Sequence, residues 1–201
     1  DIDPTEIDIV EVLAKAGKLG EVCLADEKIN GSGFVADFYS NFEDYSRRIL
    51  NGDDLYFKQM LSDQHIAECD SSCYKCLKTY RNMPYHGLLD WRLGIALFRI
   101  MIDNTYKAGA DGNFDYPELK GWKDLARTLL TALNEGFFRK SDCRLVYELS
   151  ETTCGIPYLY DPDKTRMPIF ASHPLWEGVA ETQILADAVF EASMEQEEDW
   201  N

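Results

Sequence analysis

The sequence lacks long hydrophobic runs and is poor in basic residues. No stretch of its 201 residues approaches the roughly 18 uninterrupted apolar residues of a membrane span. Lys and Arg number 20 against 36 Asp and Glu, which gives a formal net charge of -16. Because phosphate binding needs surplus Lys and Arg, a protein that coats DNA on its own is not expected. No signal-like apolar stretch follows Asp1, so we expect a cytoplasmic protein without membrane contact.

Sequence motifs of the common nucleic-acid enzymes are also missing. The chain has neither the Gly-Lys-Ser/Thr loop nor the DEAD/DEAH box of ATP-driven helicases, nor a His-x-Lys or paired acidic motif of a nuclease. The His-x-Glu pattern of zinc deaminases is missing as well. We therefore predict no catalytic residue. Since the first residue is Asp1 rather than Met, we expect a fragment or subunit of a larger assembly.

Composition favours a folded chain with a mixed architecture. With 45% hydrophobic and 12% aromatic residues, the chain is rich enough in apolar side chains to form a core. We predict a single domain over 1–201, of α/β or α+β class, with a small mixed sheet, several helices and an inserted zinc-binding loop at about 66–90. Hydrophobic periodicity predicts strands at 21–25, 143–149 and 167–171, helices at 34–50, 87–107, 116–138 and 180–192, and either type at 5–16.

Charge is distributed unevenly along the chain. Residues 1–68 carry 15 acidic and 6 basic residues, and residues 103–201 carry 19 and 9. The segment 69–102 between them carries only 2 acidic residues against 5 basic ones, together with half of the cysteines. The sequence therefore describes an acidic body with a basic insert. The acid excess is typical of a solvated surface, and docking onto a basic partner is the alternative.

Three cysteines and a histidine in this insert predict a structural zinc site. Cys69, Cys73 and Cys76 form a C-x3-C-x2-C pattern, and His86 follows ten residues later. Zinc takes four such donors in a tetrahedron, and short Cys spacings let one turn supply several thiolates. Thiol exchange at the C-x2-C pair is an alternative. The fourth ligand also has alternatives, namely Cys23, Cys143, Cys154 and, more weakly, His65.

Aromatic and basic side chains alternate between the predicted ligands. Such a pattern on a metal-pinned loop suits contact with phosphates and stacked bases, and predicts these DNA-binding residues: Tyr74, Lys75, Lys78, Tyr80, Arg81 and Asn82. The alternative is a loop whose tyrosines pack on the domain and whose cations balance the acidic body. Asp90 and Arg92 are predicted to orient His86 or the loop, because histidine ligands usually donate their other N–H to a neighbour.

The run CDSSCYKCLKTYRNMPYHGLLDWRLGIALF, from Cys69 to Phe98, resembles the zinc-binding signature of a helicase-associated domain of unknown function. That domain occurs in DISARM DrmA/DrmB anti-phage proteins and in MrfA-type DEAD/DEAH helicases. The family often has Arg directly after the position of Asp90, whereas here Trp91 intervenes. Asp26 with Gly31–Gly33 is similar to a glycine-rich turn of the family, and His173–Trp176 resembles a terminal motif of longer members. The matching positions are Cys69, Cys73, Tyr74, Cys76, Leu77, Tyr80, Asn82, His86, Leu89 and Asp90.

The resemblance implies a zinc-stabilised accessory module of a DNA helicase or translocase complex in bacterial anti-phage defence. Its implied partners are a helicase motor domain or subunit and, through that complex, DNA. The alternative is a purely structural protein-docking module of a DNA-repair helicase, with zinc for stability and acidic faces for protein contact. A nuclease is a third hypothesis, with less support because no catalytic motif is present.

Overall fold

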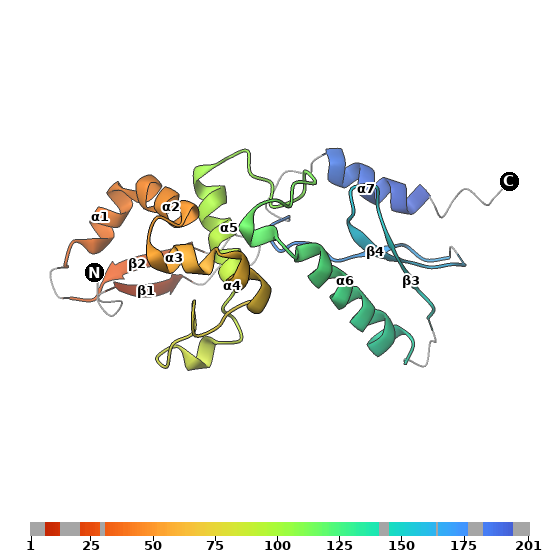
Figure 1. Ribbon diagram of the computed structural model, residues 1–201, viewed down its shortest axis with the longest axis horizontal. Coiled ribbons are helices and arrows are strands. Elements are labelled where there is room, and N and C mark those ends of the chain that lie inside the picture. The colour runs from red at the N-terminus through yellow and green to blue at the C-terminus, as the bar shows by residue number, and fades with distance from the viewer. Residues whose placement is uncertain are drawn as a thin grey trace. The chain divides into compact units, whose positions relative to one another are not determined.

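The computed structural model describes residues 7–12, 21–28, 31–140, 145–163, 165–176 and 183–194. Helices and small antiparallel sheets alternate along these residues, so the fold is mixed α+β (Figure 1). The chain divides into two compact units, Asp1–Asn51 and Gly52–Asn201. The prediction of a single domain did not include this division. No helix among the described residues is long and apolar enough to cross a membrane.

The first unit is a β-hairpin followed by two helices. Strands β1 (Ile7–Val12) and β2 (Glu21–Asp26) pair antiparallel, which assigns the ambiguous segment to a strand. Helices α1 (Phe34–Ser40) and α2 (Phe42–Asn51) replace the single helix predicted over 34–50. The break falls at Asn41, whose side-chain amide donates to the backbone oxygen and to Oδ1 of Asp37. Asparagine competes for helix hydrogen bonds in this way, so it favours helix ends.

Asp26 joins the hairpin to the first helix. Its carboxylate accepts hydrogen bonds from the backbone N–H groups of Gly33 and Val35, at 3.0 and 3.2 Å. The glycine-rich turn needs its glycines: Gly31 has φ of 73°, and an added Cβ there would lie 3.1 Å from Oδ2 of Asp26. The turn therefore brings backbone donors to a carboxylate of the chain itself.

The second unit begins with three helices: two lead into the predicted zinc loop and one follows it. Helices α3 (Leu55–Met60) and α4 (Asp63–Glu68) were not predicted, because each spans only six residues. A single 3-10 turn, η2 (Met83–Tyr85), follows within the loop. Helix α5 (Trp91–Ile102) begins later than the predicted residue 87 because Asp90 caps it, accepting from the N–H groups of Arg92 and Leu93. It also ends earlier than the predicted residue 107.

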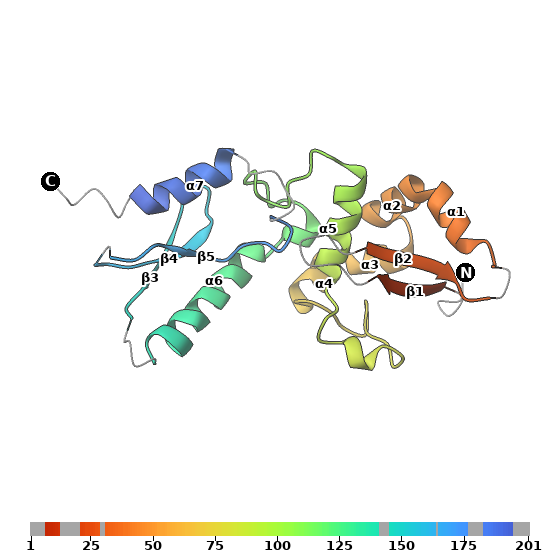
Figure 2. The same cartoon turned by 180° about the vertical axis from the view of Figure 1, so that it is seen from behind.

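The rest of this unit packs helices against a three-stranded sheet. The predicted helix over 116–138 is divided into the 3-10 turn η3 (Pro117–Leu119), α6 (Trp122–Leu133) and the π-turn η4 (Asn134–Phe138). The strands pair antiparallel in the order β3-β4-β5, and they run between α6 and α7 in Figures 1 and 2. These remaining elements are β3 (Glu148–Glu151), β4 (Pro157–Tyr160), β5 (Ile169–Phe170) and α7 (Gln183–Met194).

Two of these elements differ from the sequence prediction. The strand predicted at 143–149 lies partly outside the described residues, and pairing begins only at Glu148. Strand β4 was predicted as part of a turn-rich segment because of Pro157 and Pro162, yet it is the central strand of the sheet. Its Tyr158 and Leu159 are buried, so tertiary burial outweighs the local turn signal.

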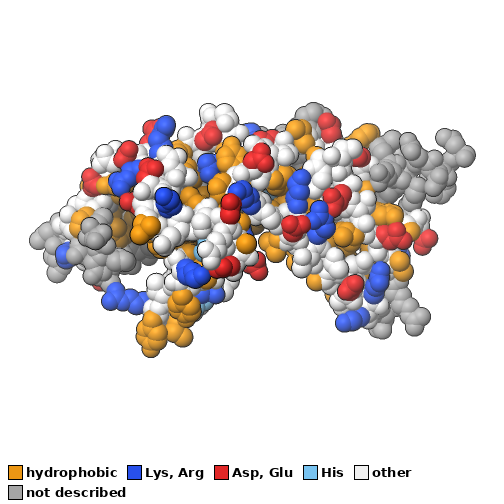
Figure 3. Space-filling model, viewed as in Figure 1, with side chains coloured by type: hydrophobic (Ala, Val, Ile, Leu, Met, Phe, Trp, Pro, Cys, Tyr) orange, Lys and Arg blue, Asp and Glu red, His pale blue; other side chains and the backbone are white. Residues whose placement is uncertain are grey.

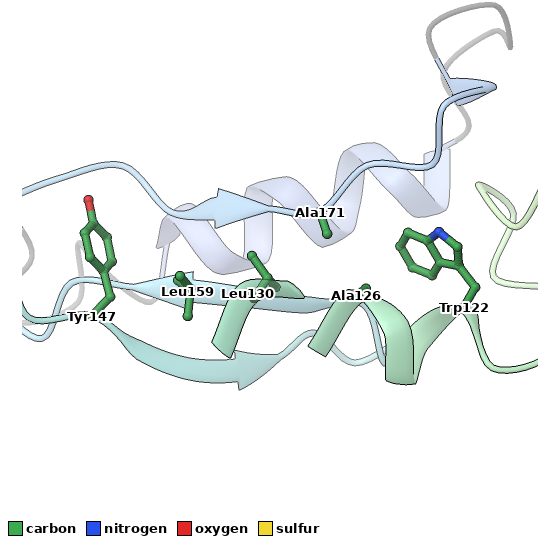
Figure 4. Packing of buried hydrophobic residues seen from close by; sticks show 6 residues of the cluster. All are labelled: Trp122, Ala126, Leu130, Tyr147, Leu159 and Ala171. Atoms are coloured by element: carbon green, nitrogen blue, oxygen red, sulfur yellow. The ribbon is translucent and has the colours of Figure 1, made fainter. Parts of the chain in front are cut away.

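The core of this half forms where α6 meets the sheet. Trp122, Ala126 and Leu130 recur every four residues, which places them on one helix face. Figure 4 shows this face beside Leu159 of β4 and beside Tyr147 and Ala171, which flank β3 and β5. Beside the core, Arg99 of α5 forms an ion pair of 2.6 Å with the fully buried Glu118. The buried residues of the cluster are Trp122, Ala126, Leu130, Tyr147, Leu159 and Ala171.

The segment His173–Trp176 is part of this core. The indole Nε1 of Trp176 donates to the backbone oxygen of Ala108 at 2.9 Å, and its ring packs against Trp122. His173 is buried, and its Nδ1 accepts a hydrogen bond from the N–H of Leu175 at 3.2 Å. An accepting Nδ1 requires an unprotonated nitrogen there. Burial lowers the pKa of His173 below 6.5, against the opposing charges of Asp90 and Glu118.

Acid should therefore destabilise the chain through His173. Its folded-state pKa is lowered, so the stability that it contributes is complete above pH 6.5 and is lost as the pH falls toward the lowered pKa. In that window the slope is up to about 1.4 kcal/mol per pH unit. Thermal unfolding between pH 8 and 5 should show a smaller acid loss in His173→Gln. His86→Gln is the control, and an unchanged slope in His173→Gln would contradict the assignment.

Candidate metal centre

Helix α4 places the first two members of the cluster. Ser62 caps the helix, and its Oγ accepts from the N–H of His65 at 3.3 Å. Cys69 follows four residues after His65, at the helix end, where its N–H donates to the backbone oxygen of His65. Residues four apart lie on the same helix face. The imidazole and the first thiol therefore point into the same space.

A tight turn adds two more thiols. The backbone oxygen of Cys73 accepts from the N–H groups of Cys76 and Lys78, at 3.1 and 3.0 Å, which folds the C-x2-C segment back on itself. His65, Cys69 and Cys76 are buried and Cys73 is half-buried. One donor atom from each of these four residues lies within 4.8 Å of every other. We call this group the His65–Cys76 cluster.

Three donor–donor distances in the cluster match the edges of a coordination tetrahedron. Sγ of Cys76 lies 3.9 Å from Sγ of Cys69 and 3.7 Å from Sγ of Cys73, and Nε2 of His65 lies 3.5 Å from Sγ of Cys73. Bonds of about 2.3 Å to sulfur and about 2.1 Å to nitrogen give tetrahedral edges of about 3.8 and 3.6 Å. The sulfurs are much farther apart than the roughly 2.05 Å of a disulfide, so the thiols are free.

Electrostatics within the cluster also favour a cation. Burial and the neighbouring sulfurs raise the pKa of Cys69 to about 12. Burial opposes ionisation of Cys73 too, but hydrogen bonds, first among them one from the N–H of Lys75, outweigh burial and lower the pKa of Cys73. Several thiolates packed this closely repel each other, whereas a divalent ion among them would hold each deprotonated.

Among the described residues, the ring of His65 has no hydrogen-bond partner outside the cluster. Its Nδ1 is buried without a hydrogen-bond partner among the described residues, and its ring lies edge-on to Trp91 at 5.4 Å. Buried polar atoms are normally hydrogen-bonded, so an imidazole with one nitrogen unpaired and the other facing a thiol is unusual. The donor set and the distances together fit a bound metal ion.

Helix α5 anchors the backbone of residues 66–70, which include Cys69 of the cluster. Arg92 donates to the backbone oxygens of Ile66, Cys69 and Asp70, and Nε1 of Trp91 also donates to Cys69. Arg92 was predicted to orient the loop, and it contacts the backbone of a cysteine in the cluster. Asp90 was predicted in the same role, but its described bonds cap α5.

His86 is not in the cluster, contrary to the prediction that it is the fourth ligand. Its Nε2 lies 2.9 Å from the backbone oxygen of Thr79 and 3.0 Å from Oδ1 of Asn82. Both atoms are acceptors, so this nitrogen carries a hydrogen and cannot also donate a lone pair to a metal. His86 closes the loop by hydrogen bonding, and His65 takes the predicted position beside the cysteines.

Two features of the sequence could have identified His65. It stands four residues before Cys69, which is ligand spacing on a helix, and Ser62 three residues earlier is a good N-cap. Both depend on recognising α4, which is too short to show a clear hydrophobic period. Among the alternative ligands, Cys23 lies in the first unit, Cys154 follows β3, and Cys143 lies outside the described residues.

The predicted DNA-binding residues have different surroundings. Asn82 is occupied within the loop, since its Nδ2 donates to the backbone oxygen of Leu77 and its Oδ1 accepts from the N–H of Thr79. Lys75 forms an ion pair of 3.0 Å with Glu68. Tyr74, Tyr80 and Arg81 are exposed, and Lys78 is half-buried.

The loop at 77–88 extends from the cluster, as Figure 1 shows in yellow and green below α4. Hydrophobic side chains gather at the projecting end of this loop in the space-filling view (Figure 3). Tyr80 is 86% exposed and Leu88 is 82% exposed. Soluble proteins seldom leave such side chains together in water unless they contact a partner. We call this surface the aromatic loop; its exposed large hydrophobic residues are Tyr80, Met83, Tyr85 and Leu88.

Metal binding should show whether His65 or His86 is a ligand. His65→Ala removes a donor of the cluster and should lower the affinity for Co2+ at least about tenfold, with a change in the visible absorption that reports coordination geometry. His86→Ala removes only loop hydrogen bonds and should leave the Co2+ spectrum unchanged.

Spectrophotometric titration of the full chain with Co2+ measures both effects. Comparison of the far-ultraviolet circular dichroism of the two variants controls for folding. Loss of the tetrahedral absorption in His86→Ala with retention in His65→Ala would restore the original ligand prediction.

Comparison with known proteins adds no assignment to this geometry: no family model matches the chain, and neither a curated protein nor a solved structure matches it.

Proposed function

We propose that the His65–Cys76 cluster binds a structural zinc ion. Three thiolates and an imidazole are donors that zinc prefers, whereas magnesium and calcium take oxygen ligands. Four protein donors fill a tetrahedron and leave no open position for a substrate, which distinguishes a structural site from a catalytic one. The ion would link the end of α4 to the turn before the aromatic loop.

We further propose that the chain is an accessory module of a DNA helicase or translocase complex in bacterial anti-phage defence. The observation that carries this proposal is the aromatic loop, which exposes Tyr80 and Arg81 next to the cluster. An exposed aromatic ring stacks on bases, and an adjacent guanidinium pairs with phosphate. Arrangement on one metal-pinned loop would let these groups act together.

Charge supports a role within a complex rather than alone. The chain carries a formal net charge of -16, so the field of the whole molecule repels nucleic acid. Lys75 is already paired with Glu68, which leaves Lys78 and Arg81 as the main predicted phosphate contacts on the loop. Few phosphate contacts imply weak binding with a shallow salt dependence. A motor that holds the DNA would supply the remaining affinity.

Protein docking is the second candidate function, and the apolar part of the aromatic loop favours it. Leu88 and Met83 are exposed, although neither can pair with phosphate. Hydrophobic side chains on a projecting loop are typical anchors for a pocket in a partner protein. This alternative needs the same zinc site but predicts that the cations of the loop contribute nothing to DNA binding.

DNA binding should depend on the tip of the loop. Tyr80→Ala should weaken binding of the zinc-loaded chain to a labelled oligonucleotide by about 1–3 kcal/mol, because a stacking ring is lost. Moderate salt is used because it screens the repulsion between the acidic chain and the oligonucleotide. Tyr80→Phe retains the ring and should bind like the native chain. Fluorescence anisotropy measures both.

Charge reversal separates the two candidate functions. The double variant Lys78→Glu/Arg81→Glu should weaken binding about tenfold or more and flatten its salt dependence, because phosphate contacts are lost. Lys58→Glu/Arg139→Glu reverses two exposed cations outside the loop, one Lys and one Arg, and serves as the matched control. Equal affinities for the two charge variants would favour protein docking.

A further inference from the structure

The three thiols of the cluster differ in their access to solvent. Cys69 and Cys76 are only 3% and 7% exposed, whereas Cys73 is half-buried. A hollow of about 350 Å³ lies at the His65 side of the cluster and is lined by His65, Glu68 and Lys75 among others. Because the side chain of Cys73 is itself partly exposed, small polar molecules can reach its thiol. Oxidation of cysteine follows thiolate character and access, so the thiols differ in susceptibility.

A resolving thiol stands next to Cys73. Sγ of Cys76 lies 3.7 Å away, and the C-x2-C turn holds the two residues on one short segment. A small movement of the side chains would bring the sulfurs to bonding distance. The other described cysteines outside the cluster, Cys23 and Cys154, lie in the first unit and after β3.

We propose that Cys73 is a peroxide-sensitive ligand and that its oxidation releases the ion. This inference rests on the proposed zinc site and adds a means of regulating it. The Cys73 thiolate attacks hydrogen peroxide, forms a sulfenic acid and expels hydroxide, which a proton converts to water. The Cys76 thiolate then attacks the Cys73 sulfur, forms a disulfide and expels a second hydroxide, which is also protonated. Two thiolates are oxidised, one peroxide is reduced to two waters, and the zinc ion leaves unreduced.

Release follows from the loss of two donors. A disulfide between Cys73 and Cys76 leaves only Cys69 and His65 as ligands, and a zinc site with two protein donors binds weakly. The aromatic loop begins directly after Cys76 and would lose the metal that pins its start. Oxidation would thus free the start of the aromatic loop from the metal. Helix α5 is anchored through its own hydrogen bonds and would remain folded.

The experiment uses the zinc-loaded full chain and stoichiometric hydrogen peroxide. A chromogenic chelator follows zinc release, and peptide mass spectrometry after alkylation of free thiols maps the disulfide. We expect one zinc released for each Cys73–Cys76 disulfide formed, and uptake of zinc again after treatment with dithiothreitol. First formation of a Cys69–Cys76 bond, or release without any disulfide, would overturn the proposal.

Two variants test the assignment to Cys73. Cys73→His replaces the thiol with a donor that peroxide does not oxidise readily, so zinc should stay bound and its release should slow at least about tenfold. Cys154→Ser should release zinc at the native rate. Fast release from zinc-loaded Cys73→His would contradict the proposal. If Cys73→His takes up no zinc, the first disulfide formed in the native chain decides whether Cys73 is the peroxide-sensitive ligand.

Zinc uptake tests the proposed metal site, whereas zinc release in peroxide tests this inference. A native chain that takes up no zinc overturns the metal site and this inference together. A chain that holds zinc but retains it in peroxide overturns the inference alone. Neither measurement involves DNA, so failure of DNA binding would leave both conclusions standing.

Discussion

Three thiols and an imidazole lie together in a space of a few ångströms, and a cation bound among them would stabilise this arrangement. Buried thiolates repel one another, and a neutral buried thiol such as Cys69 finds few strong hydrogen-bond partners in exchange for its burial. A divalent ion changes this balance, because it attracts all four donors at once and makes metal binding part of the folding free energy. An ion bound in the proposed site would link α4, the C-x2-C turn and the start of the aromatic loop.

The protein supports this centre from α5. Arg92 and Trp91 donate hydrogen bonds to the backbone of the ligand segment, so the helix that follows the loop also anchors the residues before it. Asp90 caps the same helix. The loop is therefore held at both ends, while His86 and Asn82 close its interior. Such a loop can expose Tyr80 without collapsing onto the domain, which suits a surface that contacts a partner.

The fold places this surface on a stable scaffold. The helix α6 packs against the sheet, and the ion pair of Arg99 with Glu118 links α5 to the turn before α6. A buried charge pair of this kind constrains geometry more than it adds stability. Neither this core nor the described part of the first unit contains a second group of metal-binding donors like the His65–Cys76 cluster.

Local sequence was enough to predict Cys69, Cys73 and Cys76 as neighbours, because short spacings in one turn bring thiols together in almost any fold. It also predicted β2, most of α5 and the apolar face of α6, whose patterns are local. It did not distinguish His65 from His86, since ligand choice depends on which ring nitrogen faces the sulfurs and which is hydrogen-bonded elsewhere. The strand β4 likewise became visible only through its pairing with β3 and β5. Spacing within one turn is a property of sequence, whereas competition between distant partners for one side chain is decided by tertiary structure.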